Sequence, residues 1–132
     1  PALAHAIDLA GRQRMLSQAA IKDSCLLSQA ALTGLDPAQI TADLTARIDL
    51  FEETAGELRA GNEDTGIAPP PNVEAENALD TVQVTWQDMR ELLNPALDGT
   101  PLGADRLGDL ATSYAVLLPQ LEDVVWYYVN GN

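Results

Sequence analysis

The sequence predicts an all-α protein, specifically an antiparallel four-helix bundle with up-down-up-down connections. Three observations support this fold class. Apolar residues recur at steps of three and four through four long segments, glycine and proline separate those segments, and no long run alternates apolar and polar residues. Long helices with short connections are typical of such bundles. The 132 residues fit one domain over residues 1–132.

The first half of the chain is expected to form two helices. The first covers about residues 2–32, and Gly34 follows as its stop signal. Asp36 and Pro37 then read as an N-cap followed by a first-turn proline, which is a strong start signal. The second helix is expected to continue to about residue 60, because Gly61 follows its last apolar position.

The second half is expected to form two further helices after a stiff loop over residues 61–72, which contains three consecutive prolines. The third helix starts near Val73, and Pro95 is expected to kink or fray its end. After a short turn, the fourth helix covers about residues 104–130. A bend is expected at Pro119 within it.

Composition excludes several functions. The net charge of −13 leaves no basic face for nucleic acid or for an anionic membrane surface. No apolar run approaches the ~20 residues that span a bilayer, so membrane association is expected only through flanking segments. Residues 2–4 resemble a signal-peptide cleavage site, which suggests an exported protein or an excised domain. Cys25 cannot form an internal disulfide, and its apolar neighbours predict a buried thiol.

No catalytic, metal or cofactor site is predicted. His5 is the only histidine, and the sequence has no Cys-x-x-Cys-His, Glu-x-x-His or glycine-rich phosphate motif. We therefore expect a protein that is not an enzyme and carries no cofactor. Trp86 lies on an apolar stripe and is assigned to the core, whereas the aromatic run of residues 126–128 should expose at least one ring.

Arginines near the start of the chain are the main functional candidates. One seam of the first helix contains Ala10, Arg14 and Ser17, and Gly11 lies beside it, so Arg14 is expected to turn inward among small neighbours. A buried cation needs an anion, so Arg14 could bind a ligand, pair with an acid of another helix or extend to water. Arg12 follows an acid four residues earlier, which predicts a partly exposed Asp8–Arg12 ion pair.

The run from Asp8 to Gln18 resembles the signature of the PilJ-type sensor domain, the N-terminal part of type IV pilus methyl-accepting chemotaxis transducers. That domain is related to the sensor domain of NarX-type nitrate/nitrite kinases. Residues 117–125 resemble its final helix. Two positions differ from the usual pattern: Asp8 replaces an asparagine, and Ala19 replaces an arginine.

The resemblance implies a periplasmic bundle that forms a parallel homodimer through its first helix. It further implies that a small planar anion, nitrate or nitrite first, binds between Arg14 of both chains, with close approach at Gly11. Ala10, Ser17 and Arg12 complete the candidate ligand-binding set. Binding would shift the helices and signal to a chemotaxis or kinase module. The alternative is a dimerising or partner-binding bundle that has lost small-ligand binding.

Overall fold

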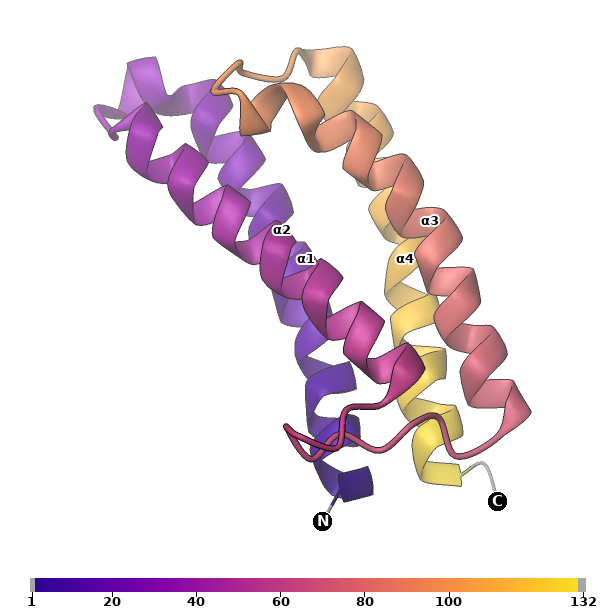
Figure 1. Ribbon diagram of the computed structural model, residues 1–132. Coiled ribbons are helices and arrows are strands. Elements are labelled where there is room, and N and C mark those ends of the chain that lie inside the picture. The colour runs from indigo at the N-terminus through magenta and orange to yellow at the C-terminus, as the bar shows by residue number, and fades with distance from the viewer. Residues whose placement is uncertain (1, 131–132) are drawn as a thin grey trace.

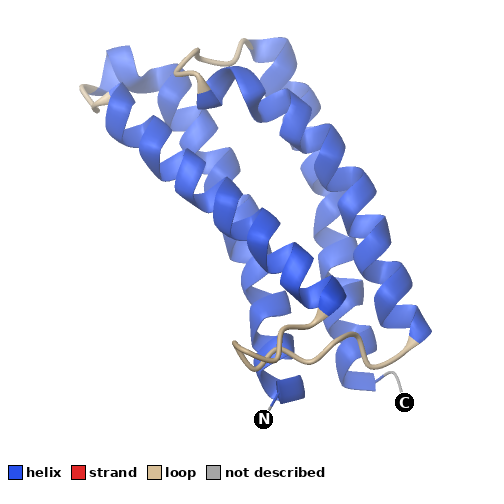
Figure 2. Cartoon of the chain, in the orientation of Figure 1, coloured by secondary structure: helices blue, strands red, loops and turns tan. Residues whose placement is uncertain are grey.

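The computed structural model describes residues 2–130 as four helices (Figure 1). They are α1 (Ala2–Thr33), α2 (Pro37–Ala60), α3 (Val73–Leu97) and α4 (Ala104–Asn130). No strand occurs in this part of the chain (Figure 2), so the predicted all-α four-helix bundle is confirmed. Successive helices run in alternating directions in Figure 1, which brings both chain ends to the same end of the molecule.

The helix boundaries follow from local chemistry. Asp36 caps α2 by accepting a hydrogen bond from the Ala38 backbone N–H at 3.0 Å, as the sequence predicts. Gly34 and Gly61 both adopt positive φ angles, 72° and 76°, at the ends of α1 and α2. The sequence signals therefore locate the ends of these two helices correctly.

The C-terminal end of α3 contains Pro95, where a kinked or frayed end is expected. Proline lacks the N–H that would bond the carbonyl of Glu91 four residues earlier. Arg106 of α4 instead donates to the carbonyl oxygens of Glu91 at 3.2 Å and Leu92 at 3.3 Å. The last turn of α3 is thus supported from another helix, and it continues past Pro95 to Leu97.

The four helices pack as two hairpins, α1 against α2 and α3 against α4. The α1–α4 contact is the main connection between the hairpins, whereas α2 and α3 touch less extensively. Phe51 and Trp86 stack between α2 and α3 with their ring centroids 4.0 Å apart. Trp86 is almost completely buried, which confirms its predicted place in the core.

Helix α1 contributes small side chains to the core. Its buried stripe consists of Ala6, Ala10, Gln13, Ser17, Ala20, Ser24, Leu27 and Ala30, together with Asp23 beside it. Small residues along most of this stripe let the neighbouring helices approach α1 closely. The charge of Asp23 is compensated by Arg47 of α2, whose Nε lies 2.7 Å from the Asp23 Oδ2.

Candidate functional site: a groove between the first and last helices

Arg14 lies on the outside of the bundle. Its side chain is 57% exposed, so the predicted inward orientation is wrong for the single chain. The buried stripe of α1 passes through Gln13, and one residue further along an α-helix is rotated by about 100°. That rotation turns Arg14 from the core toward the neighbouring edge of α1.

The guanidinium of Arg14 is only loosely compensated within the chain. Its Nη1 lies 3.9 Å from Oε1 of Glu122 on α4, at the outer limit of an ion pair. Exposed pairs of this kind contribute little to stability, about 0–1 kcal/mol. Because guanidinium carries five N–H donors, the Arg14 side chain keeps donors that an incoming anion can use.

A shallow groove adjoins Arg14. It has a volume of about 290 Å³ and is lined by Ala10, Gly11 and Arg14 of α1 and by Leu121, Glu122 and Val125 of α4. A Cβ atom added at Gly11 would meet nothing within 4 Å, so α1 presents open backbone here. The structure therefore brings together three of the five predicted site residues beside the final helix.

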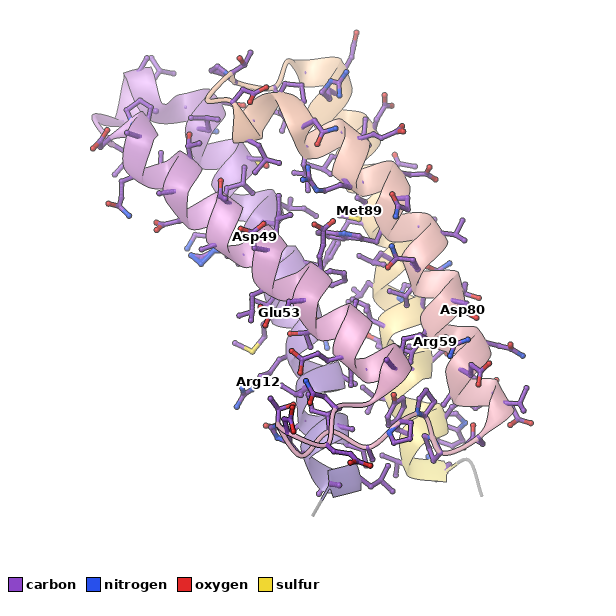
Figure 3. The ribbon with its side chains drawn as sticks, viewed as in Figure 1. Arg12, Asp49, Glu53, Arg59, Asp80 and Met89 are labelled. Atoms are coloured by element: carbon purple, nitrogen blue, oxygen red, sulfur yellow. The ribbon has the colours of Figure 1, made fainter. Side chains whose placement is uncertain are left out.

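The other two predicted site residues lie elsewhere. Arg12 forms the predicted ion pair with Asp8, with 3.2 Å between its Nη2 and the Asp8 Oδ2, on the outer side of α1 (Figure 3). Ser17 is fully buried, and its Oγ donates to the Arg14 carbonyl oxygen at 2.9 Å. Neither residue lines the groove.

Two further predictions concern the surface. The prediction of a buried Cys25 is wrong, because this thiol is exposed. The core face of α1 at this level is occupied by Ser24 and Leu27, which turns Cys25 outward. The aromatic run behaves as predicted: Trp126 is 60% exposed, whereas Tyr128 is buried and its hydroxyl donates to the Leu58 carbonyl oxygen at 3.4 Å.

Sequence reasoning missed Gln13 and Glu122. The signal for Gln13 was present, because Ala6, Ala10, Gln13 and Ser17 follow one another at steps of four, three and four. Glu122 had no local signal, since its position depends on how α4 lies against α1. Among residues 2–130, no group of three histidine, cysteine or acidic side chains could hold a metal ion.

Comparison with known families identifies the fold that carries this groove. Residues 2–110 match the PilJ family, the N-terminal region of type IV pili methyl-accepting chemotaxis transducers. The chain belongs to the PilJ family. The match runs from α1 into the start of α4 and includes the α1 residues of the groove.

PilJ is a family of chemoreceptor sensor domains rather than enzymes, so this PilJ domain is a sensor module of a signalling protein. No curated protein and no solved structure gives a significant match to the chain. None of the four helices of the PilJ domain, as far as residues 2–130 are described, has the length and apolar character needed to cross a membrane.

Proposed function

We propose that this PilJ domain is an extracytoplasmic sensor that binds a small oxyanion, nitrate or nitrite first, between two copies of the chain. Each copy would contribute Arg14 from its α1–α4 groove. The single observation that carries the proposal is the exposed, loosely paired guanidinium of Arg14 beside the open backbone of Gly11. The proposed location outside the cytoplasm rests on the chain's membership in a transducer sensor family.

The chemistry of arginine suits such a ligand. Guanidinium is planar and presents its donors as a fork, which matches the geometry of a planar oxyanion. Two copies of Arg14 facing each other across a twofold axis would repel, and a bound anion would relieve that repulsion. Because Arg14 is exposed in the single chain, the second copy is what would shield the site from water.

The position of the groove suits signalling. Its two walls belong to α1 and α4, the first and last helices. The start of α1 and the end of α4 lie at the same end of the bundle (Figure 1). A ligand that prefers one separation of these helices would shift their equilibrium toward that arrangement. The resulting displacement would be available to an output module at the chain ends.

Calorimetric titration with sodium nitrate tests this proposal. The Arg14→Ala variant should lose at least about tenfold in affinity, because it lacks the charged donors that face the ligand. Arg12→Ala is the matched control: it removes an exposed arginine two positions away that is already paired with Asp8. Equal nitrate affinities of the wild type and Arg14→Ala would contradict the proposal.

Glu122→Gln provides a second, opposite change. The Glu122 carboxylate is the acid that competes for Arg14 in the single chain. Its neutral replacement should tighten nitrate binding by about two- to fivefold, in line with the small energy of an exposed ion pair. Weaker binding to Glu122→Gln, measured in the same titration, would indicate that the groove is not the anion site.

A second function is favoured by the same ion pair and by exposed apolar residues. Glu122 already supplies a counter-charge to Arg14, and Met15 on α1 is 70% exposed. These features fit a bundle that binds a partner chain without a small ligand. Stable dimers in sedimentation experiments, combined with no heat of nitrate binding, would support this alternative over the anion sensor.

A further inference from the structure

A second hollow lies inside the bundle and opens between α2 and α3. Its volume is about 290 Å³, and all four helices contribute to its wall. Most of the inner wall is apolar and comes from Ala10, Leu58, Leu79, Val82, Leu121 and Val124. The volume is near the lower limit for small-molecule sites, which are typically about 300–1,000 Å³.

Gln13 is the polar group at the inner end of this cavity. Its side chain is only 3% exposed, and its Nε2 donates to the Phe51 carbonyl oxygen at 3.0 Å. A carbonyl can only accept, so this bond orients the amide with its nitrogen toward Phe51. The amide Oε1 then has no donor among the described residues. A buried acceptor without a donor is unfavourable, so a ligand that supplies a donor gains affinity.

Two sets of polar contacts between α2 and α3 lie on either side of the cavity mouth. Toward one end, Oε2 of Glu52 accepts hydrogen bonds from Trp86 Nε1 at 2.9 Å and Arg90 Nε at 3.2 Å. Toward the other end, Arg59 of α2 contacts Asp80 of α3, with 2.8 Å between Arg59 Nε and Asp80 Oδ1 (Figure 3). These contacts tie α2 to α3 above and below the opening.

Between these contacts, the α2 residues at the opening are small. The helix presents Ala55 and Gly56 to the cavity, and a Cβ added at Gly56 would meet nothing within 4 Å. The opening is therefore built from a pair of small residues between two fixed points.

The charges at the mouth disfavour an anion, and the apolar inner wall disfavours any charged group. Glu52 and Asp80 are acidic, and Arg59, the one cation among the described residues that line the cavity, is already paired with Asp80 and Glu76. An anion would therefore meet excess negative charge. We propose that this cavity binds a small uncharged organic molecule with an apolar body and one N–H or O–H donor, which bonds Gln13 Oε1.

This cavity is separate from the α1–α4 groove beside Arg14 but adjoins it. Ala10 and Leu121 line both hollows, one from the inside of the α1–α4 contact and one from the outside. A molecule in the cavity would press on that contact without touching Arg14. The two sites can therefore be tested independently in the same protein.

Indole and benzofuran are suitable probes because they have nearly the same shape and only indole has an N–H donor. Titration followed by two-dimensional NMR should show that both bind the wild type and that indole binds about five- to tenfold more tightly. Gln13→Leu removes the acceptor at similar volume and should abolish this preference. Arg14→Ala should leave the binding of both probes unchanged.

Ala55→Leu should fill the cavity and remove binding of both probes. Ala46→Leu, an exposed alanine on the same helix, is the matched control and should bind both normally. Nuclear Overhauser contacts from indole to the methyl groups of Val82 and Val124 locate the probe in the wild type, whether or not the variants fold. Failure of both probes to bind, equal wild-type affinities, or contacts outside the cavity would overturn the proposal.

Discussion

Among residues 2–130, Asp23 is the only acidic or basic residue that is buried. Burial raises the pKa of its carboxyl above the usual value, while the Arg47 guanidinium 2.7 Å away opposes that rise. The protonated form of Asp23 is therefore favoured more in the folded chain than in the unfolded chain. The contribution of this group to stability is complete below the unfolded pKa of 3.8 and is lost as the pH rises through the folded pKa.

Arg47→Leu should make this pH dependence larger. Without the guanidinium, a charged Asp23 stays buried without its counter-ion, and we expect a loss of about 2–4 kcal/mol in the free energy of unfolding at pH 7. At pH 4 the carboxyl can remain protonated, so the loss should be smaller. Urea denaturation at both pH values measures the difference.

Arg12→Leu is the control for the Arg47 experiment, since its pair with Asp8 is exposed. It should cost less than about 1 kcal/mol at either pH. An Arg47→Leu loss that is identical at pH 4 and pH 7 would contradict the assigned role of the buried carboxyl.

The sequence predicted the Asp8–Arg12 pair but not the orientation of Arg14. Spacing within one helix turn is sufficient for the first, because both partners share a helix face. Predicting the orientation of Arg14 required the exact direction of the core face of α1. Half-buried apolar residues such as Leu9 and Leu16 lie off the buried stripe and blur that direction in the sequence.

At the level of elements, the loop between α2 and α3 depends on Gly61. This residue has a φ of 76°, and a Cβ added to it would lie 3.0 Å from the Pro69 backbone nitrogen. Gly66 in the same loop has a nearly equal φ of 75° but no atom within 4 Å of an added Cβ. Gly61 also combines its positive φ with an extended ψ of 161°, a conformation that is essentially restricted to glycine.

Gly66→Ala should lower the free energy of unfolding by about 1–2 kcal/mol, the usual cost of a left-handed backbone for an L-residue. Gly61→Ala combines the strain of a backbone conformation that is essentially restricted to glycine with a collision at the rigid Pro69 ring, so its loss should exceed that of Gly66→Ala by about 1 kcal/mol or more. Chemical denaturation of both variants tests this difference. Equal losses would show that the loop shifts freely away from Pro69.

The helix boundaries were the most predictable features of the fold, because the residues that define them act locally. Asp36, Pro37 and Gly34 act within one turn of the helix ends that they define. The end of α3 was less predictable. Its continuation past Pro95 is supported by Arg106, a residue of the next helix whose position no local rule supplies.

At the scale of the whole molecule, the proposed function would link ligand binding in the α1–α4 groove to association of two copies. If nitrate bridges two copies of Arg14, it binds the dimer more tightly than the monomer and must strengthen dimerisation by mass action. Sedimentation equilibrium should show a wild-type dimer constant that increases with nitrate and is unaffected by an equal concentration of chloride.

Arg14→Ala distinguishes this linkage from simple salt screening. Removing the two like charges should let the variant dimerise at least as well as the wild type without nitrate. Its dimer constant should then be insensitive to nitrate. A nitrate response that persists in Arg14→Ala would place the linked anion at another site.

The sequence alone determined the number, type and approximate ends of the helices and the family signature around Arg14, because periodicity and capping are properties of neighbouring residues. Only the tertiary structure decided which side of α1 faces the core. It paired Arg14 with Glu122 and left Gln13 Oε1 without a partner beside a cavity. These features arise where several helices meet, and their relative rotation is determined by packing across the whole bundle.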